Sequence, residues 1–582
     1  MTNSKIASIF REIAIYLDMD GVPFKPRAYE RAADVIETLD RPLGEIHATG
    51  GLKALKAIPG VGPAIAEKIA ELVTTNRLEY HARLREQMPV DVADLIAIEG
   101  VGPKNIKALY RSLGVKTVED LERAARQHKV QGLARFGERS EERILRSIAF
   151  LRASAGRFPI GQVLGLVQDI QERLTAIPGV AQVIIAGSIR RRRETVGDAD
   201  LLVVSRQPRR VSEFVVAMPE VVHVHGSGET KTSVKLRTAM DLDVRVVPRE
   251  SLGAALNYFT GSKAHNVELR RRAQDRGLKL NEYGVFRGTR RIAGRTEEEV
   301  YAALDLPYIP PELREGAGEV EAASAGTLPT LIDHGDLRGD VQMHTSWTDG
   351  TNSIEEMAAE AKRIGLDYIA ITDHTKGLAM TGGCDEAKIR RQIAEIARIK
   401  RKLRGIAILT GAEVNINKDG TLDIDDETLA LLDVVGVAVH SHFNMSRAEQ
   451  TERIIRAMRN PHADILFHPT GRVINQREPY DVDMDALIAE AKQTGTVIEI
   501  DAFPDRLDLR DDHIRRAVQA GVKLTIDSDA HKTEHMRYLS FGIDQARRGW
   551  VAKDDVLNTR PLKTFLTALK DGRTGQEPFL PQ

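Results

Sequence analysis

GSIRRRRETVGDADLLVVS, residues 187–205, is the stretch of this 582-residue chain that constrains its fold most. Asp198 and Asp200 open an apolar run, and alternate residues of a strand point to one face, so we predict that both carboxylates lie on the same side of a sheet. A third carboxylate follows in the next apolar segment, where Asp241 and Asp243 alternate onto one face and spacing alone does not choose between them. Three hard oxygen ligands suit two Mg²⁺ or Mn²⁺ ions that act on phosphates.

The residues around this stretch indicate a mixed α and β domain that binds phosphate. Apolar, strand-like segments recur between residues 159 and 248, beside one helical segment. Gly187 and Ser188 would let the backbone approach a phosphate closely. The arginine run at residues 190–193 is compatible with a solvated face, but its place beside the carboxylates favours an electrostatic phosphate site.

The Gly-Ser pair followed by Asp-x-Asp resembles the nucleotidyltransferase pattern of the DNA polymerase beta superfamily, which antibiotic-modifying and RNA-tailing enzymes share. Residues 258–286, YFTGSKAHNVELRRRAQDRGLKLNEYGVF, resemble the family X DNA polymerases more specifically. The resemblance favours Asp243 as the third metal ligand, and it implies a palm and a thumb that select dNTPs. The nucleotide-binding residues that it implies are Gly187, Ser188, Arg143, Arg191, Tyr258, Phe259, Gly261, Asn266 and Arg270.

Two near-copies of a glycine-rich pattern lie in the helical first 150 residues, IPGVGPAIAEKIA at 58–70 and IEGVGPKNIKALY at 98–110. Glycine permits a tight turn, and the amides that open the following helix can face a phosphate oxygen. A tight turn between packed helices also needs glycine, but two copies favour a binding role. The pattern resembles the helix-hairpin-helix motif, a DNA-backbone binder, and the DNA-contacting turn residues would be Gly60, Gly62, Gly100 and Gly102.

The first copy, with AYERAADVI at residues 28–36, also resembles the small N-terminal domain of DNA polymerase beta. The resemblance implies that Lys68 forms a Schiff base with a 5′-deoxyribose phosphate, which requires an activated amine. It implies 5′-phosphate contacts from Lys25, Tyr29 and Lys56. Two departures, Ala64 and Tyr80, stand where the family often has basic residues, and an exposed helix lysine is the alternative interpretation of Lys68.

From residue 340 onward, short apolar strands alternate with helical stretches, which predicts a parallel α/β domain, closed into a barrel. Histidines and carboxylates are spread along it, several directly after a strand, where functional side chains of such barrels lie. They are His344, Asp349, His374, Glu413, His440, His468, Asp529 and His531. Imidazole and carboxylate groups bind Zn²⁺, Mn²⁺ and Fe²⁺. Clustered metal ions stabilise the attacking and the leaving oxygen of a phosphoryl displacement.

Six segments in order, beginning with DVQMHTSWTDG at residues 340–350, resemble the motifs of the PHP (polymerase and histidinol phosphatase) domain. The resemblance implies a distorted α/β barrel with up to three Mn, Zn or Fe ions. The family's first His-x-His begins here with Gln342, whose amide is a poor ligand for these cations. We therefore expect one metal position to be weaker, altered or empty. Asp373 and His442 are candidates for hydrogen-bonding partners of the ligands.

The chain is 42% hydrophobic and 29% charged, as expected of a globular protein with several domains. We predict a lyase-like helix-hairpin-helix domain (1–85), a second helix-hairpin-helix domain (86–150), a nucleotidyltransferase palm (151–250), a thumb (251–315), a linker (316–334) and a PHP barrel (335–575).

Charge and cysteine content limit the class of protein further. Residues 1–315 hold 49 Lys and Arg against 41 Asp and Glu, whereas residues 316–582 hold 34 against 43. A basic first half is compatible with polyanion binding, although charge also varies between domains by chance. The single cysteine, Cys384, excludes a disulfide framework, and we find no secretory or membrane-spanning segment. We expect a monomer in the cytoplasm, associated with the nucleoid.

Together these patterns predict a family X DNA polymerase that fills short gaps in base-excision repair and carries a Mn-dependent 3′–5′ exonuclease. Gapped or nicked duplex DNA, 3′ ends and dNTPs would be its substrates. One alternative is a template-independent nucleotidyltransferase joined to a small-molecule phosphatase, and another is a catalytically weak DNA-binding scaffold. The paired hairpins disfavour the first alternative, and the intact carboxylates Asp198, Asp200 and Asp243 disfavour the second.

Overall fold

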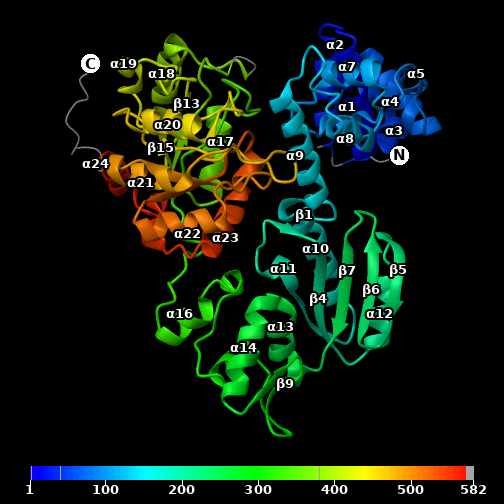
Figure 1. The fold of residues 1–582 in the computed structure, drawn as a ribbon, viewed down its shortest axis with the longest axis vertical. Coiled ribbons are helices and arrows are strands. Elements are labelled where there is room, and N and C mark those ends of the chain that lie inside the picture. Colours follow the sequence, from blue (N-terminus) through cyan, green and yellow to red (C-terminus); the bar gives the residue numbers. More distant parts are fainter. Residues whose placement is uncertain (2, 38, 40, 379–380, 572–582) are drawn as a thin grey trace. The chain divides into compact units, whose positions relative to one another are not determined.

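The computed structural model describes residues 1, 3–37, 39, 41–378 and 381–571, which form two compact units. One unit comprises Met1–Ala155 with Asn475–Glu478, and the other holds the rest of the described chain. Figure 1 shows the helices of the first unit in blue to cyan and, in the second, a sheet-containing region followed by a barrel. None of the helices within the described ranges combines the length and the apolar character needed to cross a membrane.

The first unit is built from short helices around an apolar core that includes the fully buried Phe10 and Ile13. Its helices are α1 (Asn3–Met19), α2 (Lys25–Glu37), α3 (Leu43–Lys56), α4 (Pro63–Thr75), α5 (Glu79–Gln87), α6 (Val92–Ile96), α7 (Pro103–Leu113), α8 (Val118–Arg126) and α9 (Glu138–Ser154). The turns before α4 and α7 share one backbone geometry. Gly60 has φ +77° and Gly100 has φ +83°, a region that side chains other than glycine rarely adopt.

The second unit begins with a five-stranded sheet in the order β2-β4-β7-β6-β5. Its strands are β2 (Val180–Ile185), β4 (Asp198–Ser205), β5 (Val221–Ser227), β6 (Lys231–Leu236) and β7 (Asp241–Val246). Strands β4 and β7 run parallel, so that Asp198 lies opposite Asp241 and Asp200 opposite Asp243. Beside the sheet are α10 (Ile160–Thr175), α11 (Gly187–Arg190), α12 (Pro208–Val216) and the short pair β1 (Phe158–Pro159) and β3 (Thr195–Val196).

A smaller α+β region follows, with its own core around Leu269 and Tyr301. It comprises η1 (Arg249–Ser251), α13 (Leu252–Thr260), α14 (Lys263–Asp275), β8 (Lys279–Asn281), β9 (Gly284–Arg287), β10 (Arg290–Ala293), α15 (Glu297–Ala302) and η2 (Pro311–Leu313). The segment predicted as a linker contains a helix, α16 (Glu319–Ala325). Its Val320 and Ala323 join this core, because small side chains let the helix pack closely.

The C-terminal region is a parallel sheet whose strands follow their order in the chain, as the alternating pattern predicts. The strands are β11 (Gly339–Asp340), β12 (Tyr368–Ile371), β13 (Ala407–Asn415), β14 (Val434–Ala438), β15 (Ile465–Leu466), β16 (Val497–Asp501) and β17 (Leu524–Asp527). A parallel bridge between Met343 and Ala530, just after the two edge strands, nearly closes the sheet into a barrel. Parallel strands with their C-terminal ends at one rim bring the residues that follow them together.

Helices cover the outside of this barrel, so β14 is buried along its whole length. They are α17 (Ile354–Arg363), α18 (Glu386–Lys402), α19 (Asp426–Leu429), α20 (Arg447–Met458), α21 (Met484–Thr494), α22 (Asp511–Ala520), α23 (Leu539–Arg548) and α24 (Leu562–Asp571). Short 3₁₀ turns complete it at η4 (Thr533–Tyr538), η5 (Lys553–Asp555) and η6 (Leu557–Thr559).

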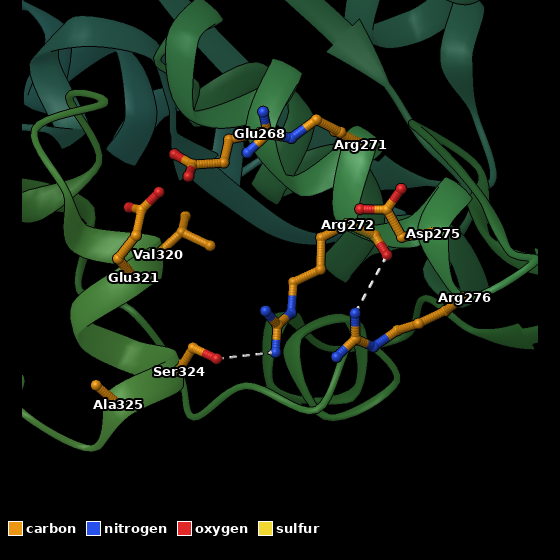
Figure 2. A pocket seen from close by; sticks show the side chains of 9 residues that line it. All are labelled: Glu268, Arg271, Arg272, Asp275, Arg276, Val320, Glu321, Ser324 and Ala325. Atoms are coloured by element: carbon orange, nitrogen blue, oxygen red, sulfur yellow. Dashed lines mark hydrogen bonds between the residues drawn. The ribbon is translucent and has the colours of Figure 1, made fainter.

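A cavity of 410 Å³ lies between α14 and α16, lined by charged side chains of both helices (Figure 2). Arg272 Nη2 donates to Ser324 Oγ at 3.3 Å, which ties the two helices together. The Glu268 and Glu321 carboxyl groups face each other across the cavity. Burial raises the pKa of Glu268 to about 7, and its hydrogen bond to Glu321 contributes to the rise. The same hydrogen bond lowers the pKa of Glu321, and a proton shared by the two carboxyl groups accounts for both shifts.

We predict that this pair makes the second unit less stable as pH rises through 7. The folded-state pKa of Glu268 lies above the usual 4.5, so the folded chain binds more protons between these values and loses stability as pH increases. Glu268→Gln removes the titration and should raise the unfolding temperature at pH 8, by on the order of 1–2 °C because the pair is partly exposed. At pH 5 it should give no gain. Calorimetry of the exposed-site variant Glu250→Gln is the control, and an equal gain at both pH values would contradict the shared proton.

Candidate metal centres and nucleic-acid interface

Glu413 on β13 is the centre of the barrel site, and its side chain is fully buried. Its Oε1 lies 2.8 Å from His440 Nε2 and 2.7 Å from His468 Nε2. Its Oε2 lies 3.1 Å from His344 Nε2 and 3.4 Å from His374 Nδ1. Although burial alone would raise the pKa of Glu413, the surrounding imidazoles hold it well below its usual range. One carboxylate thus faces four histidines.

All eight side chains predicted as ligands lie in this one region of the barrel. Asp529 Oδ1 lies 3.1 Å from His344 Nε2, and Asp349 Oδ2 lies 3.5 Å from His374 Nε2 and 3.6 Å from His531 Nε2. Three overlapping sets each place one ligand atom per residue within 4.8 Å of the others. These sets are His344, Asp349, His374 and His531; His374, Glu413 and His440; and His344, Glu413 and Asp529.

The strand ends and a strained backbone aim these side chains inward. His374, His440, His468 and Asp529 follow β12, β14, β15 and β17 within three residues. Asp529 has φ +49° and His468 has φ +28°, values that residues with a side chain rarely adopt. Such strain persists where the surrounding structure imposes it, commonly at functional sites.

The donor set suits divalent cations. His344 Nε2 faces two carboxylate oxygens at 3.1 Å, yet neither ring nitrogen of His344 makes a hydrogen bond among the described residues. The Nδ1 atoms of His374 and His468 are likewise buried without such a bond in that part of the chain. Because buried polar atoms normally have a partner, these nitrogens and carboxylates fit ligands of Mn²⁺, Zn²⁺ or Fe²⁺.

Hydrogen bonds behind the ligands fix their orientation. His440 Nδ1 lies 2.7 Å from Asn415 Oδ1, which defines which ring nitrogen faces Glu413. Asp373 accepts hydrogen bonds from Thr345, Thr348 and Gln392, so it braces the loop of His344. Asp373 and His442 fall in none of the ligand sets formed by the described residues.

Gln342 occupies the position where the family has a histidine, and it is fully buried. Its Nε2 lies 3.4 Å from Glu413 Oε2, and with the amide reversed the nitrogen instead donates to both oxygens of Glu499. Burial raises the pKa of Glu499 well above its usual range, and the nearby carboxylates Asp501 and Asp527 raise it further. Gln342 therefore lies between Glu413 and a group of buried acids beneath the site, and its amide can donate to one or to the other.

Arg506 is a member of the site that the sequence analysis did not identify. Its Nε lies 3.6 Å from Asp501 Oδ2 and 3.7 Å from Asp529 Oδ2. The side chain is still 25% exposed, so the cation sits at the edge of the cluster. No pattern in the sequence distinguishes Arg506 from other arginines, because its position depends on the loop that follows β16.

The second group of carboxylates lies at one end of the β4–β7 pair. Burial raises the pKa of Asp200 to about 7, and the charges of Asp198 and Asp243 add to the rise. Gly187 has φ +62°, and a Cβ there would lie 2.5 Å from Asp200 Oδ2, so only glycine fits. Three mutually repelling carboxylates suit divalent cations, which would relieve the repulsion.

The partners of Asp241 and Asp243 differ. Asp243 accepts a 2.6 Å hydrogen bond from Ser233 Oγ and lies 2.7 Å from Lys231 Nζ. Asp241 pairs instead with His225 and Lys235, each at 2.9 Å. No group of ligand atoms within 4.8 Å of one another joins Asp198, Asp200 and Asp243 among the described residues. Lys231 forms an ion pair with Asp243 there. Of Asp241 and Asp243, Asp243 is the one whose charge is among the causes that raise the pKa of Asp200.

The residues implied for nucleotide binding cluster near α13 and α14. Tyr258, Asn266 and Arg270 line one small pocket. Asn266 Nδ2 donates to the Tyr258 carbonyl at 2.7 Å, and Arg270 Nε donates to the Asn266 carbonyl at 3.1 Å. These bonds tie the side chains of Asn266 and Arg270 to the main chain of α13 and α14.

The remaining nucleotide-binding candidates are divided between the two units. Phe259 packs under the Arg245 guanidinium, 4.4 Å from its ring centre. Gly261 has φ +70°, and a Cβ there would lie 3.1 Å from Arg191 Nη1. Ser188 is half-buried on α11. Arg143 lies on α9 of the first unit, where its guanidinium packs against the turn at Gly100.

In the first unit, the two glycine turns lead into helices with identical starts. Gly62 caps α4 and Gly102 caps α7, both with a proline at the first helical position and without a side-chain cap. The first-turn amides of each helix are therefore not used by a capping side chain, and a phosphate oxygen is a natural partner for them.

The lyase candidates occupy different environments. Lys68 on α4 is half-buried, with its Nζ 3.2 Å from the Ala64 carbonyl and 5.1 Å from the centre of the Tyr80 ring. Lys25 and Lys56 are exposed. Tyr29 is buried against Phe10, and burial raises the pKa of its hydroxyl to about 12.

Four known domain families match parts of the chain. They are a helix-hairpin-helix domain (residues 1–78), a SAM-like helix-hairpin-helix tandem (92–149), the DNA polymerase beta thumb (255–315) and the PHP domain (340–501).

Three curated proteins illustrate the range of similarity. DNA polymerase/3′-5′ exonuclease PolX of Bacillus subtilis (strain 168) is 38% identical over 575 residues, which are 98% of this chain and 100% of that protein. A probable phosphatase of Thermoanaerobacter sp. (strain X514) is 30% identical over 238 residues, 39% of this chain and 92% of its own. DNA polymerase lambda of Arabidopsis thaliana is 24% identical over 347 residues, 54% of this chain and 62% of its own.

We predict that Glu413 is needed for cations to stabilise the barrel. At about 100 times its dissociation constant, Mn²⁺ should add about 2.7 kcal/mol, which for a region of this size is about 5–10 °C in unfolding temperature. Glu413→Gln should lose most of this Mn²⁺-induced shift. The control Glu490→Gln breaks an ion pair with Arg459 elsewhere in the barrel and should keep it. An unchanged shift in Glu413→Gln, measured by thermal unfolding with and without MnCl₂, would remove Glu413 from the ligand set.

Proposed function

Because this chain belongs to the family X DNA polymerases with a C-terminal PHP domain, we propose that it fills short gaps in duplex DNA and trims 3′ ends. The proposal rests on two separate groups of side chains, one at the end of β4 and β7 and one inside the barrel. We assign Mg²⁺ or Mn²⁺ to the first and up to three Mn, Zn or Fe ions to the second. A DNA substrate would place the protein at the nucleoid.

We assign DNA-backbone binding to the two hairpin turns of the first unit. The uncapped amides that open α4 and α7 would receive phosphate oxygens from the DNA backbone. Main-chain contacts to phosphates carry no sequence information, which suits an enzyme that acts on gaps in any sequence.

Synthesis would take place at the β4–β7 carboxylates. The primer 3′-hydroxyl attacks the α-phosphorus of the dNTP, and pyrophosphate leaves. Arg191 and Ser188 would orient the triphosphate, Tyr258 and Phe259 would pack against the deoxyribose, and Asn266 and Arg270 would reach the new base pair. Cations held by Asp198, Asp200 and Asp243 would neutralise the charge that builds up on the attacking and leaving oxygens.

Trimming would take place inside the barrel. Water attacks the terminal phosphodiester, and a nucleoside monophosphate leaves the 3′ end. Arg506, at the open edge of the cluster, would contact a non-bridging oxygen of this phosphate. Cations held by the histidines and carboxylates around Glu413 would supply charge neutralisation.

Separate substitutions test the two-site assignment. On gapped duplex DNA with dNTPs and Mn²⁺, Asp198→Ala should lose synthesis and keep degradation, whereas His374→Ala should do the reverse. Each loss should be at least about 100-fold, because even outer partners of metal ligands change activity by about 10–100-fold. Primer length on a sequencing gel reads both activities. Loss of both activities in either folded variant would refute the assignment.

The same assay separates the alternatives. A template-independent transferase would extend blunt and gapped primers equally. A small-molecule phosphatase would release phosphate from histidinol phosphate but no nucleotides from DNA. A scaffold would show neither activity at any cation concentration.

We further propose that Lys68 gives the first unit a 5′-deoxyribose-phosphate lyase activity. Its support is the position of Lys68 on the helix that follows the first hairpin, with Lys25 and Lys56 exposed in the same unit. The primary amine would add to the C1′ aldehyde of the sugar with loss of water. Loss of a C2′ proton would then break the C3′–O bond and release the downstream strand with a 5′-phosphate.

Borohydride trapping tests this lyase. The protein should become covalently linked to DNA that carries a 5′-deoxyribose phosphate, and Lys68→Ala should reduce the linked fraction at least about tenfold. Lys53→Ala, on the neighbouring helix α3, serves as the control. Equal trapping by Lys68→Ala would transfer the role to another amine, and no trapping by the unaltered protein would exclude the activity.

A further inference from the structure

The arginines at positions 190–193 form ion pairs with carboxylates from two other regions of the second unit. Arg190 Nη2 lies 2.6 Å from Glu297 Oε2, and Arg192 Nε lies 3.4 Å from Asp544 Oδ2 on α23 of the barrel. Arg191 and Arg193 both face Glu315, at 3.0 and 3.9 Å. The run is therefore held in place by ion pairs that reach as far as the barrel.

The guanidinium of Arg191 is held by two acceptors. Its Nε donates to Glu315 Oε1 at 3.0 Å, and its Nη1 donates to the Thr260 carbonyl. These two acceptors set the plane of the guanidinium. They leave Nη2 as the nitrogen for which the described chain records no acceptor, in a side chain that is 13% exposed.

Arg548, at the end of α23, holds both the acceptor and the backbone of Arg191. Its Nη1 donates to Glu315 Oε1 at 2.9 Å and to the Arg191 carbonyl at 2.8 Å. Its Nη2 donates to Asp511 on α22. The Arg548 side chain is only 2% exposed, so water competes little with these bonds.

We propose that Arg548 of the barrel is a positioning residue for nucleotide binding in the synthetic site. It shares Glu315 with Arg191 and fixes the Arg191 main chain, so Arg191 presents Nη2 to the triphosphate in one orientation. A guanidinium carries five N–H donors in a rigid planar fork, so Arg548 can serve its three acceptors at once. This inference rests on the proposed contact between Arg191 and the triphosphate.

The direction of the effect follows from the geometry. Without Arg548, both Glu315 and the Arg191 carbonyl would lose a hydrogen-bond donor. Glu315 and the Arg191 main chain would then be held less firmly, so Nη2 would no longer be presented in one orientation. The affinity for dNTP should fall, while the chemistry at Asp198 and Asp200 is little affected.

The neighbouring Arg547 provides a matched control. Its Nε donates to Glu312 Oε1 at 2.7 Å, and its Nη1 donates to the Ile332 carbonyl at 2.7 Å. It therefore also joins α23 to the segment around η2, but it contacts neither Glu315 nor Arg191. Arg547→Gln removes a comparable set of bonds and leaves the contacts of Arg548 with Glu315 and Arg191 in place.

The experiment measures single-nucleotide gap filling with dTTP by the full-length protein. Arg548→Gln should raise KM for dTTP by about tenfold, which is less than the loss of a direct partner in a buried charge pair would cause, with kcat within about twofold. Arg547→Gln should match the unaltered protein, and Arg548→Lys should be intermediate. Trimming of single-stranded 3′ ends should be unchanged. In a Glu315→Gln background the effect of Arg548→Gln should shrink, because coupled residues are not additive.

Affinity measured without chemistry gives a second readout. Fluorescence titration of dTTP onto the protein bound to a gap with a dideoxy-terminated primer should show the same loss for Arg548→Gln. Equal KM values for Arg548→Gln and Arg547→Gln would overturn the inference. Should Arg548→Gln fail to fold, a KM for Arg548→Lys equal to that of the unaltered protein would overturn it as well. If Arg191→Gln leaves KM for dTTP unchanged, the fault lies in the proposed function, because Arg191 then does not bind the triphosphate.

Discussion

The buried carboxylate of Glu413 is the group on which the barrel site depends. A charge removed from water is costly unless oppositely charged or hydrogen-bonding groups surround it, and here four imidazoles face its two oxygens. This requirement explains why the ligands come from so many strands. No single segment of a barrel can surround one carboxylate, but parallel strands that end at one rim can.

The cost of unbalanced charge acts in the opposite sense at the β4–β7 carboxylates. There, the parallel register of β4 and β7 places like charges side by side, and their repulsion raises the pKa of Asp200. Lys231 and Ser233 hold Asp243 in the described structure. Both sites thus concentrate negative charge that a divalent cation would balance. They differ in ligand type, since one offers oxygen atoms alone and the other adds imidazole nitrogen.

The arginines of residues 190–193 connect the two regions. Each pairs with a carboxylate from outside its own segment, including Asp544 and the Glu315 that Arg548 also binds. Phosphate-binding arginines need a defined orientation, because the fork of the guanidinium matches phosphate oxygens only in certain directions. The orientation of this run depends partly on side chains of the barrel, so the β4–β7 region and the barrel share structural elements without sharing the proposed ligands.

The sequence by itself determined the family and the three kinds of region, which are helical, palm-and-thumb and barrel. It also determined which residues approach one another in the barrel, because strand periodicity and motif order fix which side chains lie at one rim. Spacing along β7 left Asp241 and Asp243 equivalent, and only the family resemblance favoured Asp243. The sequence analysis missed Arg506, Lys231 and Arg548, and it interpreted 316–334 as a linker although α16 packs there. Only the tertiary structure decided where these three side chains and this helix lie, because each depends on contacts between segments far apart in the chain, and no local pattern encodes such contacts.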